Sequence, residues 1–361
     1  MNILFLGANS ANSRAINLCI NNCIPFLAVT SKRKGYTLQT NIFTRSSLFE
    51  EEVVEKRNSK EHYHFVLDSV LFNFAKFNDW LLDKKFKPDL VINTSDSIQL
   101  LRLEKAVNDY YNCASHFDEF TLDFFTEKKF QQKVCDDLHI PTPNPNSDTL
   151  IVKRNFLQHQ PSKIKVPKIR AVNNDYIYDD NYEFAQEWVD IEHIYNCDVY
   201  IDSYGNWYFT RCNKMLCDKS IPYFAYEPYF PTSKELDKIS SILTPFKDAL
   251  KIRKRFIMFQ LMKRRNSEEI LYQECNARPS YEFNWIRNHK RSTYDPFSLL
   301  IFDKPIPNAF TFDKILHSEL LWNRFRQNYD NIFDLDIWYD ITQNINAKEA
   351  HDGGVCSVIK L

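Results

Sequence analysis

Glycine is scarce in this chain, with only five among 361 residues, whereas soluble proteins typically contain roughly 7%. Two common nucleotide-binding loops, G-x-G-x-x-G and G-x-x-x-x-G-K-[ST], need glycines at fixed close spacing. The glycines are Gly7, Gly35, Gly205, Gly353 and Gly354, and no two of them have either spacing. The shortage therefore excludes both loops.

Long hydrophobic runs, an excess of one charge and paired cysteines are also missing. No run of about 18 apolar residues is present to cross a bilayer, and the first residues lack the basic start of a secretory signal. The 46 basic residues nearly balance the 47 acidic ones, which argues against a nucleic-acid partner. Nine cysteines without C-x-x-C spacing are typical of reduced thiols. We therefore expect a cytoplasmic protein with no nucleic-acid or membrane partner.

The residues that are present begin with an α/β pattern. Short apolar runs predict buried strands, and apolar residues at helical spacing predict helices between them. The strands are expected at 2–6, 24–29 and 89–93, and the helices at 14–19 and 72–86. Because strands that alternate with helices form parallel sheets, residues 1–110 are predicted to be a Rossmann-like domain with its active edge at the strand carboxyl ends.

The remainder has the mixed pattern of an α+β protein. Helix formers dominate residues 96–139, and the three prolines in 141–145 prevent the helix from continuing. Beyond them we expect strands at 150–153, 184–189, 196–201, 207–212, 256–262 and 270–276, a helix at 234–250, and mostly helix at 310–345. The turn at 202–206 predicts a hairpin between its flanking strands.

Two lysines, Lys128 and Lys153, each lie within a short sequence motif. Lys128 lies in the segment E-K-K-F at 127–130, upstream of I-P-T-P at 140–143. Lys153 ends the apolar strand I-V-K-R at 151–154, where a lysine is a suitable point charge for a phosphate. A lysine on a helix, by contrast, is more often a solvated side chain.

A third motif, Q-E-W-V at 186–189, is followed closely by Glu192. Its residues have the pattern of a short strand that ends in polar groups. The exposed edge of a hairpin and a functional role are equally compatible with this segment.

The fourth motif is the most specific. The strand expected at 270–276 carries Glu274 and Asn276, and Arg278 follows at the same spacing. Because side chains alternate along a strand, these three side chains should share one face. A carboxylate and amide oxygens suit Mg²⁺, and Gln260 on the preceding strand supplies another such oxygen. A half-buried strand gains no structural benefit from three polar groups on one face, so the pattern favours a functional site.

Taken in order, the four motifs resemble those of the ATP-grasp enzymes, over roughly residues 120–285. Gln260 is similar to the glutamine found in the carbamoyl-phosphate-synthetase branch. The family usually has a glycine-rich loop after the strand of Lys153, and residues 155–166 contain no glycine. This departure leaves Arg154, Lys163 or Lys165 as substitutes, or else a weaker grip on the phosphates.

The resemblance implies ATP and Mg²⁺ (or Mn²⁺) as cofactors and a role for each matching residue. These roles are phosphate binding by Lys128 (or Lys129 in the neighbouring register) and Lys153, adenine binding by Gln186, Glu187 and Val189, ribose binding by Glu192 (or His193 or Ile194), metal binding by Gln260, Glu274 and Asn276, and phosphoryl stabilisation by the catalytic Arg278. Arg211 is a candidate for binding a phosphate or substrate carboxylate, or equally a solvent-facing strand residue.

The implied architecture is an ATP-grasp fold. It divides into a Rossmann-like domain (1–110), a lid subdomain (111–185), an antiparallel-sheet core (186–305) and a helical C-terminal extension (306–361). The implied activity is an ATP-dependent ligase that activates a carboxylate as an acyl phosphate for attack by an amine. The alternatives are a degenerate nucleotide-binding or scaffold protein and a phosphotransferase on the same fold. The partners would be a small carboxylate and a small amine, and a homodimer is compatible with the sequence.

Overall fold

The computed structural model describes residues 1–6, 15–16, 18–19, 22–29, 74–94, 98–155, 169–173, 183–216, 224–229, 231–279, 296–303, 314–317 and 356–359. In chain order its helices and strands are β1 (Ile3–Leu6), β2 (Phe26–Val29), α5 (Phe74–Asp83), β3 (Leu90–Asn93), α6 (Ile98–Tyr111), β4 (His116–Phe117), α7 (Glu119–Thr126), α8 (Lys128–Asp137), β5 (Thr149–Arg154), β6 (Ile169–Asn173), β7 (Glu183–Glu187), β8 (Ile191–Ile201), β9 (Trp207–Leu216), β10 (Phe224–Pro228), α9 (Ser233–Ala249), β11 (Ile252–Arg253), β12 (Arg255–Arg264), β13 (Ile270–Asn276), α10 (Pro296–Phe302), β14 (Lys314–His317) and β15 (Cys356–Ile359).

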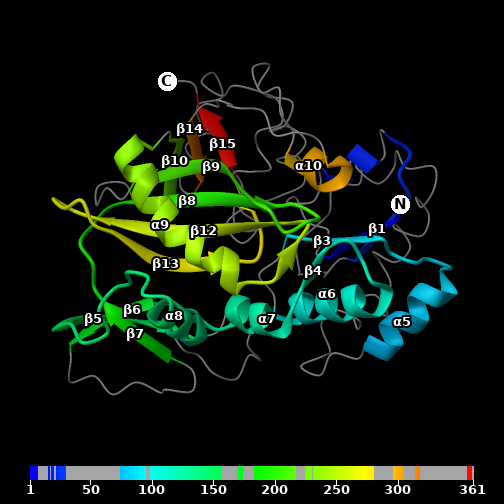
Figure 1. The fold of residues 1–361 in the computed structure, drawn as a ribbon, viewed down its shortest axis with the longest axis horizontal. Coiled ribbons are helices and arrows are strands. Elements are labelled where there is room, and N and C mark those ends of the chain that lie inside the picture. Colours follow the sequence, from blue (N-terminus) through cyan, green and yellow to red (C-terminus); the bar gives the residue numbers. More distant parts are fainter. Residues whose placement is uncertain are drawn as a thin grey trace, which may run out of the picture.

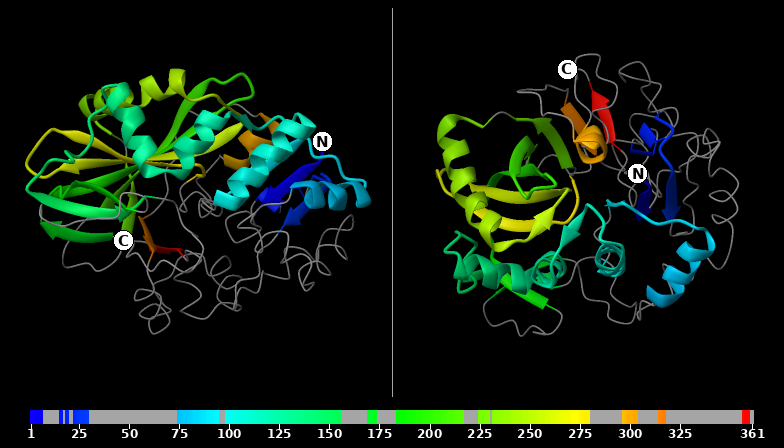
Figure 2. Two further views of the ribbon diagram at one scale, coloured as in Figure 1. Left: turned by 90° about the horizontal axis from the view of Figure 1, so that it is seen from below. Right: turned by 45° about the vertical axis from the view of Figure 1, so that its right-hand side comes forward.

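A parallel sheet forms the N-terminal part of the molecule, as the sequence predicts. Its strand order is β2-β1-β3, and β1 pairs in parallel with both neighbours. All four residues of β1 are buried, which explains why the strand is apolar at every position rather than at alternate ones. Figures 1 and 2 show this sheet, with α5 and α6, at one end of the molecule.

A seven-stranded sheet of order β13-β12-β8-β9-β10-β14-β15 forms the centre of the molecule. The predicted hairpin is present, because β8 and β9 pair antiparallel around the turn at 202–206. Gly205 in this turn has a φ of +84°, a backbone conformation that glycine adopts without steric cost. The predicted strands over 256–262 and 270–276 are also confirmed, as β12 and β13.

Helix α9 covers one face of this sheet, which we call the helix face. Thr232 begins the helix with a capping box, since its side chain and that of Glu235 each accept a hydrogen bond from the other residue's backbone N–H. The buried side of α9, including Ile239 and Phe246, joins the same apolar cluster as Phe259 of β12. The opposite face of the sheet, the cleft face, is therefore the one that α9 leaves open for other contacts.

A second antiparallel sheet, β6-β5-β7, lies below the edge strand β13 in Figure 1, together with α8. We call β5, β6, β7 and α8 the lid. Strand β7 (Glu183–Glu187) runs across the boundary expected at 185/186, so the chain leaves the lid only after Glu187. The segment 188–190 then joins the lid directly to β8.

The C-terminal extension differs from the helical segment that the sequence predicts. Within the range expected to be helical, Lys314–His317 forms strand β14, and Cys356–Ile359 nearer the end forms β15. Strand β14 pairs with β10 and β15 with β14, so the two strands widen the large sheet. The prediction of helix is wrong for these residues because a short apolar run does not distinguish strand from helix by its periodicity.

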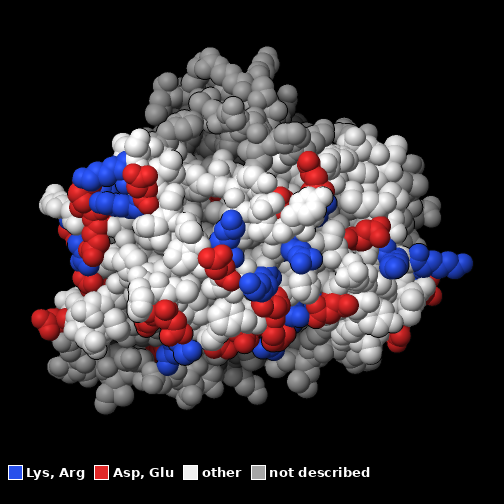
Figure 3. All heavy atoms as spheres, in the orientation of Figure 1, with Lys and Arg blue, Asp and Glu red and all other residues white. Residues whose placement is uncertain are grey.

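None of the described helices is long and apolar enough to cross a membrane. Over the described atoms of the face in Figure 3, acidic and basic side chains lie next to one another rather than in areas of one sign. This mixing agrees with the formal net charge of −1.

Candidate functional site

The amino end of α8 is fixed to the end of β5, and this junction positions two lysines. The Lys128 N–H donates to the Asn155 carbonyl at 2.8 Å, and the Lys129 N–H donates to Asn155 Oδ1 at 2.8 Å. The first N–H groups of a helix lack partners within the helix, so Asn155 satisfies two of them. Lys128 on α8 and Lys153 on β5 are thereby held on adjoining elements.

Lys128 reaches across the cleft to the large sheet. Its Nζ lies 2.7 Å from Glu274 Oε2 on β13, and Asn276 Nδ2 donates to the other carboxylate oxygen at 3.3 Å. Burial alone would raise the pKa of Glu274, but Lys128, Lys153 and Asn276 lower it to about 2. The carboxylate is therefore ionised at neutral pH, and it joins the lid to the core.

Lys153 has no comparable partner. Only 6% of the residue is exposed, and its ammonium has no hydrogen bond or ion pair within the described part of the chain. Burial, followed by the charge of Lys128, lowers the pKa of Lys153 to about 8, although Glu274 acts in the opposite direction. Two ammonium groups thus surround one carboxylate, and the net positive charge suits an anion such as a phosphate.

The cleft face of the large sheet carries three successive rows of side chains, which follow from the strand register. Residues directly opposite one another on neighbouring strands share a face. The first row is apolar and consists of Leu271, Met262, Ile194 and Met215. The second consists of Glu274, Gln260, Asn196 and Asn213. The third consists of Asn276, Met258 and Asp198, and Arg211 is the register partner of Asp198 on β9. Consecutive rows are about 6.8 Å apart, because they are separated by two residues of a strand.

The second row brings together two predicted residues, Glu274 and Gln260, and adds Asn196 and Asn213, which the sequence analysis missed. The predicted Asn276 is in the third row, as is Asp198. Gln260 lies directly opposite Glu274, and its Nε2 donates to Asn196 Oδ1 at 3.0 Å. Asn196, Asn213 and Asp198 are buried. The alternation N-C-D over 196–198, with two polar residues two apart in an otherwise apolar strand, was the available signal.

The hinge between lid and core, residues 187–190, is held by two arginines: Arg264, the last residue of β12, and Arg265, the first residue of the turn that follows. Arg264 forms a two-pronged ion pair with the carboxylate of Glu187, with distances of 2.7 and 3.0 Å. The Arg264 hydrogen bond lowers the pKa of Glu187, against the effect of burial. The Arg265 N–H donates to the carbonyl of Asp190 at 2.8 Å. The carboxylate of Glu187 is thus already paired within the protein.

The hinge adjoins the apolar row. Val189 packs in one cluster with the row members Ile194, Met215, Met262 and Leu271, and its N–H makes no hydrogen bond to the described part of the protein. Gln186 lies on the same side of the lid as Lys153, since its strand partner on β5 is Ile151. The buried Oε1 of Gln186 has no hydrogen-bond partner among the described residues. An apolar surface beside unpaired donors and acceptors suits a planar base.

Glu192 is not brought together with the other predicted residues. A β-bulge between Lys263 and Arg264 interrupts the alternation of β8 at this point. The carboxylate of Glu192 lies 3.6 Å from Lys263 Nζ. Lys263 in turn lies 3.8 Å from the carboxylate of Glu235 on α9. Glu192 therefore points to the helix face, away from the rows of the cleft face.

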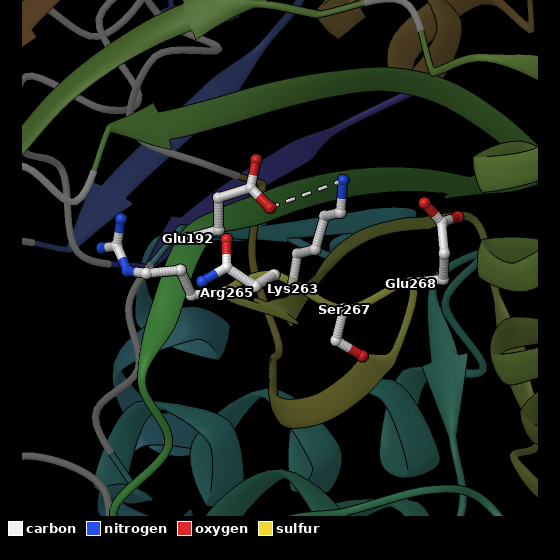
Figure 4. A pocket seen from close by; sticks show the side chains of 6 residues that line it. Glu192, Lys263, Arg265, Ser267 and Glu268 are labelled. Atoms are coloured by element: carbon white, nitrogen blue, oxygen red, sulfur yellow. Dashed lines mark ion pairs between the residues drawn. The ribbon is translucent and has the colours of Figure 1, made fainter.

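A cavity of about 410 Å³ opens beside Glu192, at the turn between β12 and β13 (Figure 4). Its lining residues are Glu192, Lys263, Arg265, Asn266, Ser267 and Glu268. Figure 4 shows Glu192 and Lys263 extending side by side from neighbouring strands, joined by their ion pair. Lys128, Lys153 and Glu274 do not line this cavity.

Of the two predicted arginines, Arg278 is described in full and Arg211 only by its backbone. Arg278 is buried directly after β13 and donates from Nη1 to the carbonyl of Pro279 at 3.1 Å. Arg211 lies opposite Asp198 in the register of β8 and β9, but its side chain is outside the described residues. The glycine-free segment beyond Asn155 is likewise outside them.

Comparison with known proteins agrees with this arrangement. No family model matches the sequence, and no curated protein matches it. Solved structures do match. The N5-carboxyaminoimidazole synthetase from Staphylococcus aureus complexed with ADP has a TM-score of 0.63 at 11% identity, covering 99% of this chain and 93% of that one. The L-amino acid ligase from Bacillus licheniformis has a TM-score of 0.60 at 10% identity, with 92% and 86% coverage.

A third similar structure is the biotin carboxylase complex with β,γ-ATP from Campylobacter jejuni, with a TM-score of 0.57, 10% identity, and coverage of 88% of this chain and 74% of that one. These likenesses extend over most of each chain, and they show a shared fold. The chain has the ATP-grasp fold, as the four sequence motifs predict.

Proposed function

We propose that the protein is an ATP-dependent ligase that activates a carboxylate as an acyl phosphate and joins it to an amine. The observation that carries this proposal is the buried Lys153, whose ammonium lies near Lys128 and Glu274 without a direct partner within the described part of the chain. The similar structures include a complex with ADP and an L-amino acid ligase, which supports nucleotide binding by this fold.

We place the adenine and the phosphates of ATP at successive positions along the strands of the cleft face. The adenine would lie on the apolar row, with the Val189 N–H and the Gln186 Oε1 as hydrogen-bonding groups. The phosphates would then lie one row further along, between Lys128 and Lys153. The two rows are about 6.8 Å apart, because a strand advances by that distance in two residues.

The oxygens of Glu274 and Gln260 in the second row, together with that of Asn276 in the third, fit a hard cation. Among the described residues no group of three or more His, Cys, Asp and Glu side chains could hold a metal, so a site here depends on one carboxylate and on amides. Gln260, Glu274 and Asn276 would hold Mg²⁺ or Mn²⁺ through oxygens, with phosphate and water completing the coordination. When bound, the ion would neutralise charge on the phosphates.

The reaction that suits this site has two steps. A carboxylate oxygen of the substrate attacks the γ-phosphorus, and the bond from that phosphorus to ADP breaks. An amine then attacks the acyl carbon, releasing phosphate and losing a proton. Arg278 would stabilise the transferring phosphoryl group through its planar donors. The lid would exclude water from the acyl phosphate.

The test is incubation with Mg-ATP and a pool of amino acids and acidic sugars. We expect ADP and phosphate in amounts that depend on the pool, together with an amide product. ADP with a phosphorylated product would identify a phosphotransferase instead. Binding of ATP without turnover would identify a nucleotide-binding or scaffold protein. Absence of any nucleotide binding, measured by calorimetry, would overturn the proposal and both alternatives.

A further inference from the structure

Arg255, the first residue of β12, contacts two separate parts of the protein through its guanidinium. Its Nε and Nη2 both donate to the carbonyl of Ala277, at 3.0 and 2.6 Å. Its Nη1 forms an ion pair with the carboxylate of Glu104 on α6. The guanidinium also lies over the rings of Phe117 and Phe125, at 5.0 and 5.6 Å from their centroids. Each of the three guanidinium nitrogens therefore donates to a buried group of the protein.

Glu104 extends this network to the parallel sheet. The residue is fully buried, and its second carboxylate oxygen accepts a hydrogen bond of 3.0 Å from Asn93 Nδ2, at the carboxyl end of β3. A continuous chain of contacts thus joins Asn93, Glu104, Arg255 and Ala277. It links the N-terminal domain to the residue that directly precedes Arg278.

Stability alone is a weak reason for this network. Buried ion pairs cost desolvation energy, and apolar residues of similar size often replace them with no loss of stability. The location is more informative. The carbonyl of Ala277 lies between Asn276, a proposed metal ligand, and Arg278, the proposed phosphoryl stabiliser. Two donors from one planar group fix the peptide plane between residues 277 and 278, and that plane sets the direction in which Arg278 leaves the strand.

We propose that Arg255, oriented by Glu104, is a positioning residue that aims the Arg278 guanidinium at the transferring phosphoryl group. The inference rests on the proposed function, because it takes Arg278 as the group that acts on the phosphoryl. Lysine cannot replace Arg255 in this role, since a compact ammonium does not hold a carbonyl and a carboxylate together in one rigid plane.

The test compares two variants with wild type in steady-state ATP turnover. Arg255→Lys keeps the charge and loses the planar fork. The double variant Glu104→Met, Arg255→Met removes both charges at similar volume and is expected to remain folded. In both variants we expect kcat to fall by about 10- to 100-fold, the effect of a misplaced reacting group. The KM for ATP should stay within about two-fold, because base and phosphate binding use other residues.

The matched control is Asp303→Asn, which breaks a neighbouring ion pair. Lys254, next to Arg255 in sequence, lies 2.8 Å from Asp303, and this pair does not contact Ala277. The control should leave both kcat and KM unchanged. If the double variant is folded and retains wild-type kcat, or if KM rises as much as kcat falls, the positioning role is wrong. If wild type itself shows no ATP turnover, the proposed function is wrong, and this outcome is distinct from a failure of the positioning role.

Discussion

Replacing Lys153 with methionine should make the protein more stable and at the same time weaken nucleotide binding. Lys153 is 6% exposed, and burial together with Lys128 lowers its pKa from 10.5 to about 8. That difference corresponds to about 3 kcal/mol spent on keeping the ammonium charged in the fold at neutral pH. Methionine keeps the length of the side chain without the charge, so the free energy of unfolding should rise by about 1–3 kcal/mol.

The pH dependence of this gain has a definite sign. The pKa of Lys153 is lower in the folded protein, so between about pH 8 and 10.5 the unfolded chain binds more protons and wild-type stability rises with pH. The advantage of Lys153→Met is therefore complete below pH 8 and disappears towards pH 10.5. Urea unfolding followed by tryptophan fluorescence at pH 7 and pH 10 measures it.

The same substitution removes a contact to phosphate. Hydrogen bonds to charged groups contribute about 1.5–3 kcal/mol, so the Kd for ADP should rise by about 10- to 100-fold. Lys133→Met is the control, because this lysine side chain on α8 is 70% exposed and should change stability by less than about 0.5 kcal/mol. If Lys153→Met destabilises the fold and still binds ADP as wild type does, the reasoning is refuted.

Three further predictions follow from the site and the fold. Glu187→Gln should lower stability by about 1 kcal/mol, because Arg264 loses a charged partner, yet leave the preference for ADP over GDP unchanged in competition titrations; a lost preference would show that the carboxylate reads the base. The affinity of wild type for ADP should fall between pH 7 and pH 9.5 as Lys153, with a pKa of about 8, loses its proton; a flat calorimetric profile would contradict this assignment. Gly205→Ala should lower the free energy of unfolding by about 1 kcal/mol because φ is +84°, and no clash adds to this cost, since the nearest atom to an added Cβ is 3.8 Å away. Denaturant titration checks this value, and the affinity for ADP should not change.

The sequence predicts local features well, because they depend on residues that are close together in the chain. The alternation of Glu274 and Asn276 correctly places both on one face of β13, as their mutual contact shows. The periodic apolar residues of α9 and the turn at Gly205 are likewise confirmed. These patterns need no knowledge of how distant segments pair.

Features that depend on pairing between distant segments were not predictable. The ion pair between Lys128 and Glu274 joins residues 146 positions apart, and no local pattern specifies it. Asn196 enters the second row only through the register of β8 against β12. Counting by twos from Asn196 would place Glu192 on the cleft face, but the bulge opposite Lys263 turns it to the helix face. A single extra residue in a strand is invisible to a period-two pattern.

The glycine shortage also bears on how the protein would bind phosphate. It excludes two standard phosphate loops, and under the proposed function side chains would take the role of the backbone N–H groups that such a loop supplies. Lys128, Lys153 and the buried amides of the second row form a charged and polar lining. Phosphate binding by side chains is thus consistent with a chain that has few glycines.

The account depends most directly on Lys128 contacting the phosphates of a nucleotide in the cleft. Calorimetric titration of wild type, Lys128→Met and Lys133→Met with a non-hydrolysable ATP analogue and Mg²⁺ tests this contact with two lysines from one helix. We expect equal binding by wild type and Lys133→Met, and at least about 10-fold weaker binding by Lys128→Met. Equal affinity in all three proteins, or no binding by wild type, would contradict the central claim.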